Sequence, residues 1–222
     1  MSIENSPKIR QRAQLERKQN KRASYDRILI VCEGEKTEPL YFQEIREFYK
    51  LQTANVKVTH SAYGTSPLQI VEYSLDECLR TRKWEQVYCV FDRDDHQSFN
   101  NAVQKVNAIN DKHKNDLKQL IKFTAIQSNP CFELWLLLHF ECVTRHSHRN
   151  QIISLLSQAD RINGYGKGQA GNFNKTKDNL KTAFQNAATL KAERDRLQSE
   201  NPYTNVDELV YRLINLGQIP SA

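Results

Sequence analysis

The sequence predicts an α/β protein with a mostly parallel four-stranded sheet, flanking helices and a helical carboxyl-terminal extension. Its short apolar runs, rich in Ile, Val and Leu, are typical of buried strands in the middle of a parallel sheet. These runs alternate with stretches whose apolar residues have helical spacing. The order strand, helix, strand, helix, strand, helix, strand, with short connections, favours parallel strands joined by right-handed crossovers.

The elements of the α/β part follow from local signals. Strands are expected where apolar runs of strand length occur, at 27–32, 55–62, 86–91 and 123–127. Helices are expected where apolar residues recur at helical spacing, at about 37–49, 66–79 and 98–112. Gly34 permits a tight turn before the first helix, and Pro39 suits an early position of that helix. The 55–62 segment alternates apolar and polar side chains, as an outer strand does.

Beyond residue 128 the patterns are mostly helical. The apolar segment 132–139 follows a break at Asn129-Pro130 and is too short to span a bilayer, so it is expected to be a core helix. Residues 163–177 contain four of the seven glycines and are expected to form a mobile loop. Further helices are expected at 150–159, 179–200 and 206–214, with a turn at 201–204. The predicted parts are a basic arm at 1–24, an α/β core at 25–128 and a helical region at 129–222 packed on that core.

Composition and charge narrow the class of protein. The formal net charge is +6, and a basic protein with an acidic site is what an enzyme acting on a polyanion requires, although moderate basicity is common in other proteins. Five cysteines without any C-x-x-C pair predict free thiols in a reducing cytoplasm. No apolar run reaches the roughly 18 residues of a membrane span, and the first residues lack the apolar segment of a signal peptide.

Carboxylates follow two of the predicted strands. Glu33 comes directly after the first strand, and Asp92 and Asp94 follow the third. Because the carboxyl ends of parallel strands meet at one edge of the sheet, these side chains are expected to lie close together. Clustered carboxylates repel one another unless a cation is present, and oxygen ligands without thiolate or imidazole suit Mg²⁺ or Mn²⁺. Asp92 and Asp94 would hold the metal, with Glu33 as a ligand or as a general base acting through water.

Four separated segments resemble the RloB-like branch of the OLD-family TOPRIM proteins: CEGEKTEPLYF, FDRDDH, SNPCFELWLLLHF and NPYTNVDELV. The TOPRIM pattern is a strand ending in Glu-Gly and a later strand ending in Asp-x-Asp, here IVCEG and VFDRD. The resemblance implies a TOPRIM-like fold and a metal-dependent nuclease acting on DNA or tRNA. It also implies a role in bacterial defence against phages beside an ATPase partner of the AAA or ABC type. Glu38 carries over as a ligand for a second ion, although the helix dipole also favours a carboxylate there.

Polar residues near the acidic cluster are further candidates. Lys36 either meets the scissile phosphate or is a solvated turn lysine, and Glu133, a charge among apolar residues, either faces the site, pairs with a base or points to solvent. The other candidates for binding nucleic acid are Ser128, Asn129, Lys167, Lys175 and Lys177. The three lysines belong to the glycine-rich segment, which does not match the phosphate-binding pattern G-x-x-x-x-G-K-[ST], so any dependence on ATP is expected to come from a partner.

Two other functions remain open on the sequence. One is a nucleic-acid-binding scaffold whose acidic cluster does not cleave. The other is a receiver-like signalling domain, which would be phosphorylated on Asp92. A Glu-Gly pair in place of an aspartate pair, and the lack of a clear fifth strand bearing a lysine, argue against the receiver. The prediction is therefore a cytoplasmic Mg²⁺- or Mn²⁺-dependent nuclease in which Glu33, Lys36, Asp92, Asp94 and Glu133 are catalytic and Glu33, Glu38, Asp92 and Asp94 bind metal.

Overall fold

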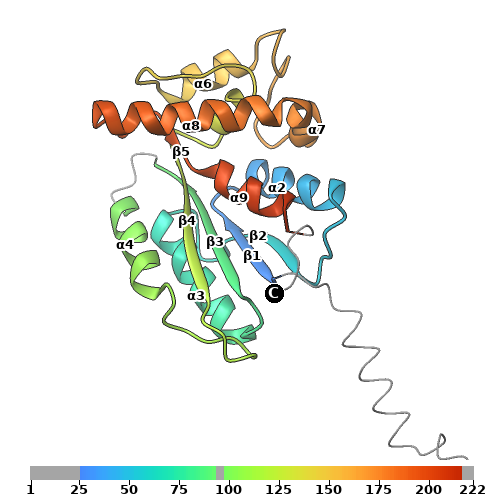
Figure 1. Ribbon diagram of the computed structural model, residues 1–222, viewed down its shortest axis with the longest axis vertical. Helices are drawn as coiled ribbons and strands as arrows, with labels where there is room; N and C mark the ends of the chain where they lie inside the picture. Colours follow the sequence, from blue (N-terminus) through green and yellow to red (C-terminus); the bar gives the residue numbers. More distant parts are fainter. Residues whose placement is uncertain (1–25, 94–97, 217–222) are drawn as a thin grey trace, which may run out of the picture.

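A computed structural model describes residues 26–93 and 98–216. These residues form an α/β fold around a single sheet in the order β2-β1-β3-β4-β5 (Figure 1). The strands are β1 (Ile28–Cys32), β2 (Val56–His60), β3 (Gln86–Asp92), β4 (Lys122–Asn129) and β5 (Tyr203–Thr204). The first four strands pair with one another in parallel, as predicted. The basic arm at 1–24 and Asp94 lie outside the described residues.

The prediction of four strands is wrong by one. β5 pairs antiparallel with β4 through Ser128–Thr204 and Asn129–Tyr203. A strand of two residues leaves no alternation of apolar and polar side chains, so its sequence is indistinguishable from the turn that was expected at 201–204. The fifth strand belongs to the carboxyl-terminal region, which therefore extends the sheet as well as packing against it.

Burial along the strands explains their order in the sheet. All five residues of β1 are buried, because β2 and β3 flank it and helices cover both of its faces. β2 alternates buried and partly exposed residues, as expected for a strand at the edge of the sheet. Side chains of β1 alternate between two apolar clusters, with Ile28 and Ile30 in one and Leu29 and Val31 in the other.

Helices cover both faces of the sheet and one of its ends. On one face lie α3 (Pro67–Thr81) and α4 (Phe99–Ile109), and on the other α2 (Thr37–Phe48) and α9 (Val206–Ile214) (Figure 1). A layer beyond one end of the strands contains α6 (Arg149–Leu156), α7 (Asn172–Thr176) and α8 (Leu180–Leu197). The remaining elements are α5 (Glu133–Leu137) and a 3₁₀ helix, η1 (Lys177–Asn179).

Two segments of the carboxyl-terminal region differ from the prediction. The apolar segment 132–139 forms only the short helix α5, whose side chains are all buried. Trp135 of α5 donates a hydrogen bond from Nε1 to Tyr41 Oη at 2.8 Å, which ties the segment to α2. The glycine-rich segment 163–177 is not loop throughout, because α7 lies within it.

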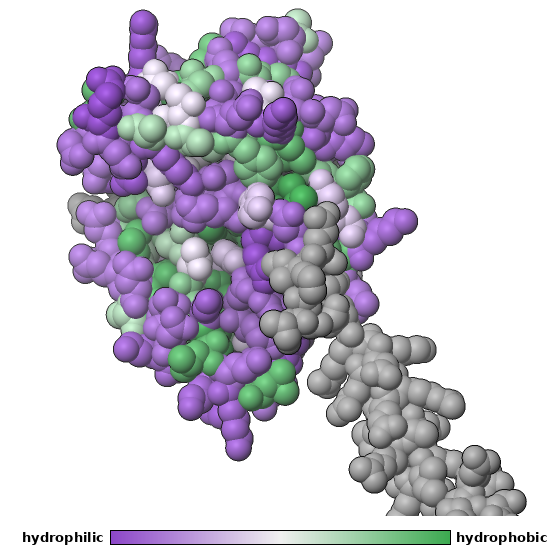
Figure 2. Space-filling model, viewed as in Figure 1, coloured by the Kyte–Doolittle hydropathy of each residue, from purple (hydrophilic) through white to green (hydrophobic). Residues whose placement is uncertain are grey.

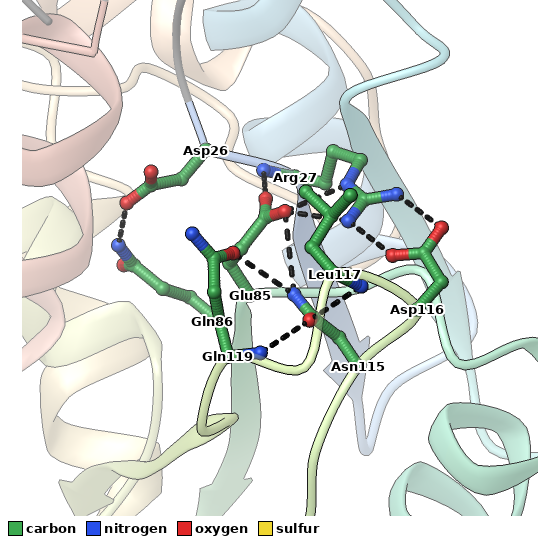
Figure 3. A network of polar contacts seen from close by, with 8 residues as sticks. All are labelled: Asp26, Arg27, Glu85, Gln86, Asn115, Asp116, Leu117 and Gln119. Carbon is green, nitrogen blue, oxygen red and sulfur yellow. Dashed lines mark hydrogen bonds and ion pairs between the residues drawn. The ribbon is translucent and has the colours of Figure 1, made fainter.

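Ion pairs join the elements at the amino ends of the strands (Figure 3). The Arg27 Nη2 atom lies 2.6 Å from Glu85 Oε1 and 2.6 Å from Asp116 Oδ1. Asp26 Oδ2 lies 2.6 Å from Arg212 Nη2 of α9. These contacts connect β1, the start of β3, the segment before β4 and the last helix, and they leave the carboxyl ends of the strands open for other contacts.

The molecular surface on the side shown in Figure 2 is mostly hydrophilic, with hydrophobic residues confined to smaller patches. Large apolar side chains are instead gathered in the two clusters on either side of the sheet. In the part of the chain that the structure describes, no helix has both the length and the apolarity that crossing a bilayer requires.

Candidate functional site

A pocket of about 480 Å³ lies at the carboxyl ends of β1 and β3. It is lined by carboxylates from four separate segments: Glu33 and Glu35 after β1, Glu38 in the first turn of α2, Asp92 at the end of β3 and Glu133 at the start of α5. Cationic side chains line it too, namely Lys36, Arg149 and Lys167. The structure thus brings together six of the residues proposed from the sequence, which are Glu33, Lys36, Glu38, Asp92, Glu133 and Lys167.

The pairing of β1 with β3 fixes Glu33 beside Asp92. The ladder continues one residue beyond β1, where Glu33 N donates a hydrogen bond to Val90 O at 2.9 Å. The Glu33 carboxylate in turn accepts a hydrogen bond from Asp92 N at 2.8 Å. Parallel register, rather than any local signal, therefore places these two carboxylates at the same edge, as the sequence predicted.

Gly34 allows the Glu38 carboxylate to lie against the turn after β1. A Cβ atom at Gly34 would be 2.1 Å from Glu38 Oε2, so any larger residue would displace that side chain. Glu38 is buried, with 8% of its surface exposed. Burial is the main cause that raises the pKa of Glu38, and the Glu133 carboxylate raises it further. In the Glu-Gly pair, the glycine therefore leaves the space that the Glu38 carboxylate occupies.

Asp92 is a buried carboxylate surrounded by other carboxylates. Burial raises its pKa well above the usual range, and the carboxylates of Glu38, Glu33 and Glu133 raise it further. The opposing cation is Arg149, whose Nη2 atom lies 2.9 Å from Asp92 Oδ2. The sequence analysis missed Arg149, because no motif or periodicity links the first residue of α6 to the end of β3.

Glu133 faces the pocket and also has a partner. It is 2% exposed and accepts a hydrogen bond from Tyr165 Oη at 2.9 Å, while Lys167 Nζ lies 4.0 Å from its Oε1 atom. Of the three alternatives open for Glu133, the structure excludes the solvent-facing one. Tyr165 was also missed, and the only signal for it is an aromatic residue between two glycines.

The glycine-rich segment is held against α2 by hydrogen bonds. Gly168 N donates a hydrogen bond to Thr37 Oγ1 at 3.0 Å. The Glu44 carboxylate accepts hydrogen bonds from Gly171 N and from Phe173 N, which lies at the start of α7. These contacts place the segment along the pocket wall and bring Lys167 to Glu133.

Four of the proposed phosphate contacts lie elsewhere. Ser128 is buried, with its Oγ atom 3.1 Å from Thr204 Oγ1, and Asn129 donates a hydrogen bond from Nδ2 to Glu200 O. Lys175 is exposed on α7, and Lys177 Nζ lies 4.8 Å from the centre of the Phe48 ring. None of the four lines the pocket. Ser128 and Asn129 instead join β4 to β5 and to the turn before it.

The pocket has donor groups of the kind that a hard divalent cation prefers, but the described side chains are not arranged around a common point. Its acidic ligands are all carboxylates, and their mutual repulsion is what such a cation would relieve. Within residues 26–93 and 98–216, however, no group of three or more His, Cys, Asp or Glu side chains is arranged to hold a metal ion. Asp94, the remaining expected ligand, falls between these two ranges.

The comparison with known proteins identifies one family. The family model described as RloB-like protein matches residues 28–213, which include all the carboxylates that line the pocket. No curated protein and no solved structure matches the chain. Since the family model covers most of the sequence, this chain belongs to the RloB-like family.

Proposed function

We propose that this protein is a nuclease that depends on Mg²⁺ or Mn²⁺ and hydrolyses phosphodiester bonds of DNA or RNA. The observation that carries the proposal is the convergence of Glu33, Glu38, Asp92 and Glu133, from four segments of the chain, in one pocket bordered by cationic side chains. Buried carboxylates that raise one another's pKa are costly to the fold. Their concentration in one pocket is accounted for if they bind a cation.

The residues proposed from the sequence have distinct roles in this mechanism. Glu33, Asp92 and Asp94 would hold the cation, and Glu38 would contribute to a second ion. The cation would lower the pKa of a water molecule and stabilise charge on the phosphate. Glu33 would accept a proton from the attacking water, and Lys36 and Lys167 would bind phosphate oxygens. Glu133, which accepts a hydrogen bond from Tyr165, would accept or donate a proton within the pocket.

The TOPRIM assignment and the biological role are parts of the same proposal. The segments IVCEG and VFDRD resemble the TOPRIM pattern, and their acidic residues Glu33 and Asp92 lie side by side at the carboxyl edge of a parallel sheet. The role as an effector of defence against phages is what the resemblance to the OLD-family TOPRIM proteins implies, and it is part of the proposal. In that role an ATPase partner would supply the dependence on ATP for which this chain has no phosphate-binding motif.

A nucleic-acid-binding scaffold without cleavage is the second candidate. It is favoured by the direct ion pair between Asp92 and Arg149, since a guanidinium already neutralises the carboxylate that would hold the metal. In this case the cationic residues of the pocket would still bind phosphates, and the acidic residues would serve only to position them.

Cleavage assays separate the two functions. The whole chain, with Mn²⁺, is incubated with plasmid, single-stranded DNA and bulk tRNA, beside Asp92→Asn and the surface control Asp195→Asn on α8. If the protein is a nuclease, the unmodified chain cleaves at least one substrate and Asp195→Asn cleaves it at the same rate. Asp92→Asn then cleaves it about a hundredfold or more slowly. The scaffold is supported if no substrate is cleaved while binding survives Asp92→Asn.

A further inference from the structure

Arg149 makes the most direct contact between a cation and a predicted metal ligand in the described part of the pocket. It is the first residue of α6, and its Nη2 atom lies 2.9 Å from Asp92 Oδ2. Lys167 lies 4.0 Å from Glu133 and is more exposed. The Arg149 side chain keeps 30% of its surface exposed, whereas that of Asp92 keeps 9%. A buried carboxylate is thus paired with a guanidinium that also borders the open pocket.

A guanidinium and a divalent cation cannot both have full access to the Asp92 carboxylate. Each is positively charged, and their mutual repulsion is strong inside a partly buried pocket. A cation that binds at Asp92 therefore weakens the ion pair to Arg149. The guanidinium, once released, is a planar donor suited to contact two oxygens of a phosphate.

We infer that Arg149 is a phosphate-binding residue that Asp92 holds until a divalent cation displaces it. Arg149 then contacts the phosphodiester of the nucleic acid beside the cation. The inference rests on the proposed metal-dependent nuclease and deepens it, because it names the residue that couples cation binding to substrate binding. By linkage, the phosphate strengthens cation binding as much as the cation strengthens phosphate binding.

The first measurement is Mn²⁺ affinity, determined by calorimetry on the whole chain without nucleic acid. Arg149→Gln removes the competing charge, so it is expected to bind Mn²⁺ about tenfold more tightly than the unmodified chain. The matched control is Arg196→Gln, which removes the same charge from an exposed ion pair with Glu193 on α8 and should leave Mn²⁺ affinity unchanged. Thermal unfolding confirms that both variants are folded.

The second measurement is the affinity for fluorescent single-stranded DNA and for tRNA, with EDTA and with Ca²⁺ in place of Mn²⁺. With EDTA, Arg149 is held by Asp92, so Arg149→Gln is expected to bind as the unmodified chain does. With Ca²⁺ the same substitution is expected to weaken binding about tenfold, and Arg149→Lys, which keeps the charge but loses the planar fork, should lie between the two. The difference between the two conditions separates a phosphate-binding role from a merely structural one.

The outcomes distinguish this inference from the proposed function. If the unmodified chain binds neither Mn²⁺ nor nucleic acid, the proposed function fails and the inference falls with it. If Mn²⁺ binds and Asp92→Asn abolishes that binding, but Arg149→Gln changes neither Mn²⁺ affinity nor the affinity for nucleic acid in Ca²⁺, the inference alone is overturned. An equal loss of nucleic-acid affinity in EDTA and in Ca²⁺ would also overturn it.

Discussion

At the scale of single residues, the pocket depends on glycine at position 34, which has no Cβ atom. A Cβ atom at Gly34 would lie 2.1 Å from Glu38 Oε2. We expect Gly34→Ala to push Glu38 from its position, to lower the free energy of unfolding by about 1–3 kcal/mol and to weaken Mn²⁺ binding. Urea denaturation and calorimetry measure the two effects.

Gly164→Ala is the control for this substitution. Gly164 has φ +65° and no heavy atom within 4 Å of a Cβ built there, so alanine is strained by the backbone alone. It should lower stability by about 1–2 kcal/mol while Mn²⁺ affinity stays unchanged. A Gly34→Ala variant with unaltered stability and unaltered Mn²⁺ affinity would show that the close contact with Glu38 has no role.

His139 gives the fold a dependence on pH that is separate from the pocket. It is buried, and its Nδ1 atom donates hydrogen bonds to the carbonyl oxygens of Trp135 and Leu136. Burial lowers its pKa to about 4, against about 6.5 in the unfolded chain. The neutral imidazole therefore stabilises the fold fully above pH 6.5, and this contribution is lost as the pH falls towards 4.

The prediction concerns the slope of stability against pH. Between pH 6.5 and 4 the unmodified chain should lose, through His139, on the order of 3 kcal/mol relative to His139→Phe, since one pKa unit corresponds to about 1.4 kcal/mol. Denaturation at several pH values gives the two curves, and all other titrating groups are common to both. Parallel curves for the two proteins would contradict the assignment.

At this scale, the sequence predicts the position of residues that directly follow a strand, but not of residues that packing brings to the pocket. Glu33 and Asp92 were predictable neighbours, because parallel strands place the residues that follow them at one edge. Arg149 and Tyr165 were not predictable, because each reaches the pocket from a segment whose path is set by packing rather than by local pattern. Ser128 was wrongly expected at the pocket for the same reason, because packing pairs its hydroxyl with that of Thr204 within the sheet.

At the scale of elements, the glycine-rich segment is positioned by α2. The Glu44 carboxylate accepts hydrogen bonds from the backbone of Gly171 and Phe173, so one side chain of α2 holds the start of α7. We expect Glu44→Ala to lower the free energy of unfolding by about 1–3 kcal/mol and to speed proteolysis within residues 163–171. Limited proteolysis followed by mass spectrometry locates the cut.

Glu47→Ala is the matched control, because Glu47 is exposed on the same helix. It should change neither stability nor the rate of proteolysis. Equal proteolysis of Glu44→Ala and the unmodified chain would show that the segment is held by other contacts.

The elements that the sequence predicted well are those with a long apolar pattern. β1, β3 and the amphipathic helices α3 and α9 all occur close to their expected positions. β5 and α7 were missed because two and five residues are too few to show a period. The segment 132–139 formed a shorter helix than expected, since an apolar run can be buried without being helical along its whole length.

At the scale of the whole molecule, the two ends of the sheet have separate tasks. The amino ends carry the ion pairs of Arg27 with Glu85 and Asp116 (Figure 3). The carboxyl ends carry the pocket. We expect Arg27→Met to lower the free energy of unfolding by about 2 kcal/mol, chiefly because it removes the charged hydrogen bonds to the partly buried Glu85 carboxylate. Mn²⁺ affinity should not change.

Arg196→Met tests the same loss of charge at an exposed pair and should leave the free energy of unfolding nearly unchanged. Chemical denaturation and calorimetry on the three proteins measure both quantities. A loss of Mn²⁺ affinity in Arg27→Met would contradict the separation of the two ends.

The most direct test of the central claim is a crystal structure of the whole chain soaked in Mn²⁺, with anomalous scattering collected at the manganese edge. The account predicts an anomalous peak in the pocket within bonding distance of Glu33 and Asp92, and displacement of the Arg149 guanidinium from Asp92. The account would be contradicted if the pocket showed no peak and Arg149 remained paired to Asp92 at a Mn²⁺ concentration at which the protein cleaves nucleic acid.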